Sequence, residues 1–204
     1  MLVCCDLSGS MFTGDGLASQ VAISLTLTCM HMCKGRFGKM FIPFSKTARL
    51  VEVQGNTLRA QLECIMKNAE VANTDFTQVY ELLISNYKMW NVPKESQVDR
   101  IYVLTDEQFD SITSNSSHTH IEHMEMRFKQ EGFKFPEVVF WCVKPNTVTF
   151  AAPNNKKGVA LVSGYSADLM RLFVDGEDLS PYGIFRKAID DSRYDRIQLA
   201  EEKN

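Results

Sequence analysis

Residues 1–11 read MLVCCDLSGSM: an apolar run at 2–5 passes directly into Asp6, and Ser8 and Ser10 follow on either side of a glycine. Four consecutive apolar residues bounded by turn residues predict a short buried strand. Open α/β sheets bind their ligands in the crevice beyond the carboxyl ends of the strands. Because carboxylate and hydroxyl oxygens are hard ligands, this stretch predicts a site for Mg²⁺ or Mn²⁺, provided that the rest of the chain supplies further ligands.

Apolar strands and helical periodicity alternate along the chain. Strands are expected at 2–5, 39–45, 49–54, 100–106, 137–144 and 159–163, helices at 17–32, 57–68, 71–90, 118–130, 167–174 and 181–191, and a loop at 107–117. The connection between 39–45 and 49–54 is too short for a parallel crossover, so these two strands should form an antiparallel hairpin. Pro43 indicates that its strand lies at or near a sheet edge, or is bulged there. The alternation predicts a mostly parallel α/β sheet with helices on both faces.

Composition sets the class of protein. The chain has 204 residues, a formal net charge of −3, 45% hydrophobic and 23% charged residues, which is ordinary for a globular protein and leaves no electrostatic footprint for nucleic acid. We expect one domain at 1–192 and a charged tail at 193–204. The first apolar run is too short for a signal peptide, no stretch is long enough to span a membrane, and the six cysteines mostly lie in apolar segments. These features predict a cytoplasmic protein with reduced thiols and no membrane partner.

Two later features complete the pattern begun at Asp6. Asp106 ends the strand expected at 100–106, and Thr74 stands where a loop enters a helix. In this order and spacing, Asp6, Ser8, Ser10, Thr74 and Asp106 resemble the metal-ion-dependent adhesion site of von Willebrand factor A (vWA) domains. The resemblance extends over almost the whole chain. Its segments are CDLSGSM (5–11), NTDFTQVYELL (73–83), VLTDEQFD (103–110), PEVVFWCV (136–143) and GVALVSGYSADLMRLFVDG (158–176).

This resemblance implies a fold, a site and a function. The fold would be a Rossmann-like, doubly wound, six-stranded sheet of order 3-2-1-4-5-6 with one antiparallel edge strand. Ser8, Ser10 and Thr74 would be hydroxyl ligands of Mg²⁺ or Mn²⁺, and Asp6 and Asp106 would bind directly or through water. An acidic residue of a protein partner would fill the open coordination position. The resemblance therefore implies a non-catalytic binding module.

Within the vWA domains, the chain is most similar to the A domain of Ro-type ribonucleoproteins and to the C-terminal half of an uncharacterised family with a similar layout. The chain lacks the RNA-binding helical repeats of Ro-type proteins, so an RNA function housed in those repeats is not implied. The alternative function is that of a component of a Ro-like ribonucleoprotein with an RNA-related scaffolding role. A vestigial site, in which the serines make only turn and cap hydrogen bonds, is a further alternative. The sequence specifies neither the partner nor the oligomeric state. It also does not specify whether the domain stands alone or belongs to a larger protein.

The sequence gives little support to an enzymatic function. Gly164-Tyr165-Ser166 resembles a nucleophile elbow, but Asp168 replaces its second glycine, and Ser166 is more simply a helix N-cap. Phosphoryl transfer at Asp6 would need a second carboxylate where Ser8 stands, and no Lys or Arg is evidently paired with this site. We therefore expect no enzyme.

Two histidine- or cysteine-containing groups have residue types and spacings that allow zinc binding. They are His118, His120 and His123 on one helix, and Cys29, His31 and Cys33 on another. The first group is expected to be solvated at a polar helix start. The second is expected to serve core packing, because no further ligand pair follows at a zinc-finger spacing.

Overall fold

The structure is a computed structural model that describes residues 1–70, 76–106, 115–144, 159–164, 186 and 189–190, with the backbone alone at 115–121 and 159–161. The chain divides into two compact units, 1–165 and 166–204. In the second unit, Asp190 N donates to Arg186 O at 2.7 Å, inside the helix expected at 181–191. The helix expected at 167–174 and the tail lie outside the described residues. Every element below belongs to the first unit.

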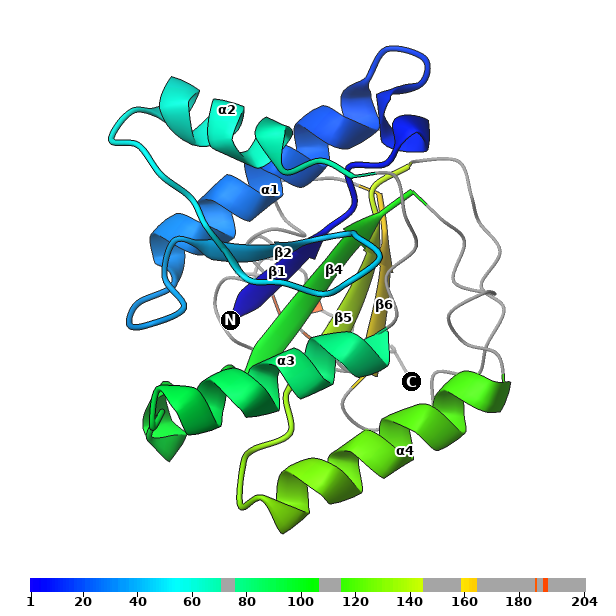
Figure 1. Ribbon diagram of the computed structural model, residues 1–204. Helices are drawn as coiled ribbons and strands as arrows, with labels where there is room; N and C mark the ends of the chain where they lie inside the picture. Colours follow the sequence, from blue (N-terminus) through cyan, green and yellow to red (C-terminus); the bar gives the residue numbers. More distant parts are fainter. Residues whose placement is uncertain (71–75, 107–114, 145–158, 165–185, 187–188, 191–204) are drawn as a thin grey trace, which may run out of the picture. The chain divides into compact units, whose positions relative to one another are not determined.

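Six strands form one sheet of order β3-β2-β1-β4-β5-β6 (Figure 1). They are β1 (Leu2–Cys5), β2 (Met40–Pro43), β3 (Val51–Glu52), β4 (Arg100–Thr105), β5 (Glu137–Cys142) and β6 (Val159–Ser163). All neighbouring strands are parallel except β2 and β3, which pair antiparallel at the edge. The predicted Rossmann-like topology, with its single antiparallel edge strand, is confirmed.

Strand register brings three chain segments to one end of the sheet. Cys5 is opposite Leu104, and Asp6 N donates to Leu104 O at 2.8 Å. Thr105 is opposite Cys142 in the next strand pair. The chain leaves β1 toward β2 on one side, whereas β4 lies on the other, so the sheet order reverses between β1 and β4. Ligands bind at such a switch point in open α/β sheets.

Helices cover both faces of the sheet, as the alternating pattern predicts (Figure 1). The four described helices of this unit are α1 (Leu17–Met32), α2 (Leu58–Lys67), α3 (Phe76–Met89) and α4 (Asn115–Gln130), with short 3₁₀ turns at η1 (Gly9–Phe12) and η2 (Lys94–Ser96). Consecutive strand residues point to opposite faces. Accordingly, Cys4 belongs to the cluster built with α3 and α4, whereas Cys5 lies beside Thr26 of α1.

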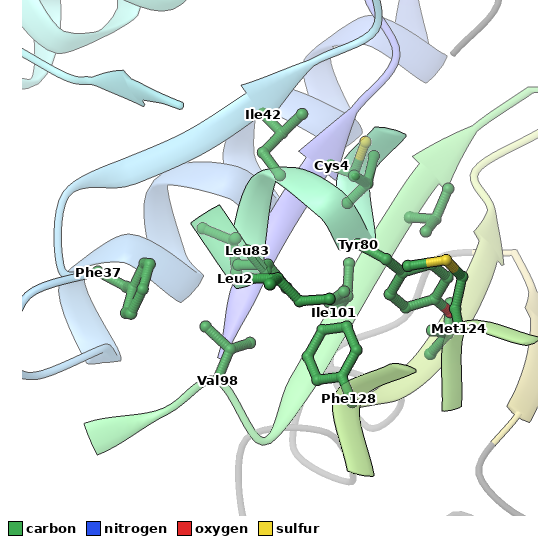
Figure 2. Packing of buried hydrophobic residues seen from close by; sticks show 14 of the residues in the cluster. Leu2, Cys4, Phe37, Ile42, Tyr80, Leu83, Val98, Ile101, Met124 and Phe128 are labelled. Atoms are coloured by element: carbon green, nitrogen blue, oxygen red, sulfur yellow. The ribbon is translucent and has the colours of Figure 1, made fainter. Parts of the chain in front are cut away.

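The core between the sheet and helices α3 and α4 holds the central strands in place. In Figure 2, Leu83 of α3 and Phe128 of α4 point toward Leu2 of β1 and Ile101 of β4. Each of these side chains is at most 2% exposed, and full burial of one such side chain contributes about 1.5–3 kcal/mol. Because β1 and β4 are fixed by this packing, the loops that leave their carboxyl ends start from a rigid base.

Local departures from the expected elements are small. Helix α4 begins at Asn115 rather than at His118, because Asn115, Ser116 and Ser117 form its first turn; such residues favour helix N-termini as well as loops. The hairpin strands are shorter than expected. Strand β3 pairs only with Met40 and Phe41 of β2, so Pro43 lies beyond the pairing of the edge strand and costs no ladder hydrogen bond there.

Candidate functional site

Asp6 is held immediately beyond β1 by three hydrogen bonds. Its carboxylate accepts from Ser8 N through Oδ1 and from Thr105 Oγ1 through Oδ2, each at 2.8 Å, and its own N–H donates to Leu104 O. The Ser8 bond is the local turn that aspartate forms with the backbone two residues on. With 1% of Asp6 exposed, the carboxylate has one fixed orientation in a buried position.

Ser8, Ser10 and Asp106 form a hydrogen-bonded row beside Asp6. Ser8 Oγ lies 3.0 Å from Ser10 Oγ, and Ser10 Oγ donates to Asp106 Oδ1 at 2.9 Å. Ser10 has a single hydroxyl proton, which it gives to Asp106, so Ser8 is the donor between the two serines. The 3₁₀ turn η1, closed by Met11 N donating to Ser8 O, gives the serines this arrangement. Ser10 is exposed whereas Asp106 is 8% exposed, so the row runs from the protein surface into the sheet.

The structure therefore brings together four of the five residues that the sequence singles out. Asp6, Ser8 and Ser10 follow β1, and Asp106 follows β4, 96 positions after Ser10. The fifth residue, Thr74, lies outside the described residues. That these residues bind a metal stays a prediction.

Thr105 is a site residue that sequence reasoning missed. It is the last residue of β4 and 0% exposed, and its hydroxyl donates to the buried oxygen of Asp6. The available signal was a hydroxyl at the end of an otherwise apolar run, IYVLT, directly before Asp106. A buried hydroxyl needs a hydrogen-bond partner, and the neighbouring strand end offers one.

Lys144 corrects the expectation that no Lys or Arg is paired with the site. Its Nζ lies 3.7 Å from Asp106 Oδ2, and its side chain is 47% exposed. The cause is register: Thr105 pairs with Cys142 and Val143 N donates to Thr105 O, which leaves Lys144 beside Asp106. A cation therefore does lie beside the site, as phosphoryl transfer would need, but Ser8 occupies the position of the second carboxylate that such a site also needs.

The donor set of the site suits a hard divalent cation. Within the part of the chain that the structure describes, no cationic side chain forms an ion pair with Asp6, and a buried carboxylate without a cation is costly. Burial raises the pKa of the neighbouring Cys5 thiol to about 12. The remaining donors are carboxylate and hydroxyl oxygens, which favour Mg²⁺ or Mn²⁺ over softer metals.

The alternative zinc groups have other contacts where their side chains are described. His31 Nε2 lies 3.1 Å from Gln61 Oε1, and Cys33 Sγ donates to Met1 O at 3.1 Å. Among the described residues, no three His, Cys, Asp or Glu side chains gather in a metal-binding arrangement. The side chains of His118 and His120 are not described.

None of the helices described in this structure is long and apolar enough to cross a membrane.

Comparison with known proteins gives relatives that are longer than this chain. Uncharacterized protein L728 of Acanthamoeba polyphaga mimivirus is 25% identical over 177 residues, which cover 86% of this chain and 30% of the relative. The Ro (RSR) protein of Deinococcus radiodurans aligns with a TM-score of 0.55 and 20% identity, over 86% of this chain and 34% of that one. A von Willebrand factor type A protein from Catenulispora acidiphila aligns with a TM-score of 0.53 and 14% identity, over 87% and 42%.

The two solved structures show that the fold is vWA-like, in agreement with the strand order found here. The chain spans about a third of the curated relative's length. A family model matches residues 1–202, and the chain therefore belongs to the family described as Domain of unknown function (DUF7788).

Proposed function

We propose that this chain is a non-catalytic binding module that holds Mg²⁺ or Mn²⁺ with Asp6, Ser8, Ser10 and Asp106 and captures an acidic group of a protein partner. The observation that carries the proposal is the row from Ser8 through Ser10 to Asp106, which joins two strand ends at the switch point of the sheet. Thr74 enters the proposed ligand set through the vWA resemblance alone.

The protein's own residues account for metal binding in two ways. Thr105 and the Ser8 N–H fix the orientation of the Asp6 carboxylate before any ion arrives, which reduces the entropy cost of binding. The serine row ends on Asp106, so a second carboxylate faces the same hydroxyls. Two carboxylates balance the charge of a divalent ion, and the neutral hydroxyls add oxygens without adding charge.

A partner would bind at the exposed side of the site. Ser10 is exposed, whereas Asp6 and Asp106 are buried. A divalent ion held here supplies a Lewis-acidic position for one further anionic oxygen, such as a carboxylate of a protein ligand. The pair of site carboxylates then does not repel the ligand, because their charge is already balanced.

Metal-dependent capture tests this proposal. The immobilised protein is exposed to soluble proteins in Mg²⁺ or in chelator, and bound proteins are identified by mass spectrometry. Asp6→Asn and Asp106→Asn keep the side-chain shapes but remove the charges. Asp99→Asn is the matched control, because Asp99 is an exposed aspartate that precedes β4 at its opposite end.

We expect acidic partners to bind the wild type and Asp99→Asn in Mg²⁺ only, and to be lost from both site variants while circular dichroism shows an intact fold. Partners that bind equally in chelator, or that bind Asp6→Asn and Asp106→Asn as well as the wild type, would contradict the mechanism.

A further inference from the structure

We propose that Lys144 is a built-in cation of this site that weakens metal binding and strengthens binding of the partner's anionic group. The inference rests on the proposed function and goes beyond it, because it assigns a residue that belongs to neither the hydroxyl nor the carboxylate set. Lys144 would thereby make the binding of metal and ligand interdependent.

The geometry separates the two roles of Asp106. Its Oδ1 accepts the Ser10 hydroxyl, and its Oδ2 faces the Lys144 ammonium at 3.7 Å. Ser10 and Lys144 thus use different oxygens of one carboxylate. The Asp106 side chain is 5% exposed, whereas that of Lys144 is 47% exposed. The ammonium therefore stands between a buried carboxylate and solvent, where it can also meet an incoming ligand.

The charges of the site give the direction of each effect. Asp6 and Asp106 carry two negative charges, and the positive charge of Lys144 leaves the site with a net charge of −1. A divalent ion at the hydroxyls would then leave the site with one net positive charge, whereas without Lys144 the loaded site would be neutral. Lys144 repels the metal and attracts the anion that follows it.

Lys144 is positioned by the fold rather than by chance contact of a long side chain. Val143 N donates to Thr105 O at 2.9 Å, so the chain leaving β5 is tied to the end of β4 directly before Lys144. This tie places the lysine next to the residue that follows Thr105, which is Asp106. The backbone of Lys144 is thus fixed beside the site, from which its ammonium reaches to 3.7 Å from Asp106 Oδ2.

The size of the effect follows from Coulomb's law. Lys144 carries one unit charge, and a carboxylate separates it from the divalent ion. With screening almost as in water at physiological salt, this charge changes the affinity of the site for the ion by about three- to tenfold. Its effect on a singly charged anion is smaller, about two- to threefold. Both effects are within the range of titration calorimetry.

The experiment is calorimetric titration of the chelator-stripped chain with Mg²⁺, in chloride and in acetate at the same ionic strength. Acetate serves as the carboxylate probe. The variants are Lys144→Met, which removes the charge, and Lys144→Arg, which keeps it. Lys134→Met is the matched control, because Lys134 pairs with Asp99 at the opposite ends of the same two strands and is similarly exposed.

We expect Lys144→Met to bind Mg²⁺ about three- to tenfold more tightly than the wild type. The increase in Mg²⁺ affinity on replacing chloride by acetate should be about two- to threefold smaller in Lys144→Met than in the wild type. Lys144→Arg and Lys134→Met should behave like the wild type. Mg²⁺ binding by Lys144→Met alone would also support the inference.

Equal Mg²⁺ affinities in the wild type and Lys144→Met, or an equal gain from acetate, would overturn the role of Lys144 and leave the metal site standing. If neither protein bound Mg²⁺, the metal site itself would be wrong, and this inference would fall with it.

Discussion

The hydrogen bond from Thr105 to Asp6 permits a quantitative prediction for Thr105→Val. Valine keeps the side-chain volume but removes the hydroxyl that donates to Asp6 Oδ2 at 2.8 Å. Both residues are at most 1% exposed, so water cannot replace the lost donor. A hydrogen bond to a charged group contributes about 1.5–3 kcal/mol, and we expect the free energy of unfolding to fall by about 2 kcal/mol.

Urea unfolding followed by circular dichroism measures this loss. With a denaturant slope of about 2 kcal/mol per molar urea, the midpoint should fall by about 1 M. The positioning role has a second readout: Mg²⁺ affinity should fall by about tenfold or more, because partners that orient a metal ligand affect affinity on that scale.

Thr26→Val is the matched control. Thr26 is also 0% exposed, but its hydroxyl donates to a neutral acceptor, Ala22 O, at 2.8 Å. Its loss should cost about 1 kcal/mol and leave Mg²⁺ affinity unchanged. A Thr105→Val loss no larger than that of Thr26→Val, together with an unchanged Mg²⁺ affinity, would refute the reasoning.

Three further predictions concern the core, the thiols and nucleic acid. Phe128→Ala should lower the free energy of unfolding by about 3–5 kcal/mol in urea titrations, whereas Met126→Ala, on the exposed side of α4, should change it by about 0.5 kcal/mol or less; equal effects would contradict the packing. Burial raises the pKa of Cys5 from 9.0 to about 12, so the folded chain retains a proton that the unfolded chain loses, and stability should fall as pH rises from about 9 to 12. Urea titrations across this range should show a shallower fall for Cys5→Ala, and an equal slope would count against the assignment. With a net charge of −3, the chain should bind RNA only weakly and in a salt-sensitive way, and tight binding at physiological salt in a filter assay would disprove this.

The fold could be predicted because its signals are local. Apolar runs such as 100–105 end in polar residues at strand termini, and the short link between β2 and β3 allows only a hairpin. The strand order itself came from the vWA resemblance rather than from these patterns. Helix α4 begins three residues before the predicted start, because Asn and Ser favour loops and helix N-termini alike.

The site was predictable only in part, for a physical reason. Asp6, Ser8 and Ser10 are close in sequence, and Asp106 ends an evident strand, so both carry local signals. Thr105 and Lys144 acquire their roles from the registers of β1 with β4 and of β4 with β5. Register depends on which strands pair and at which residue, and no local pattern in this chain encodes that for Lys144.

The most direct test of the central claim is calorimetric titration of the chelator-stripped wild type with Mg²⁺ and Mn²⁺ beside Asp6→Asn and Asp106→Asn. The account predicts saturable binding of one ion per chain in the wild type and its loss in both variants, with the fold intact. No heat of binding in the wild type, or equal binding in the variants, would contradict it.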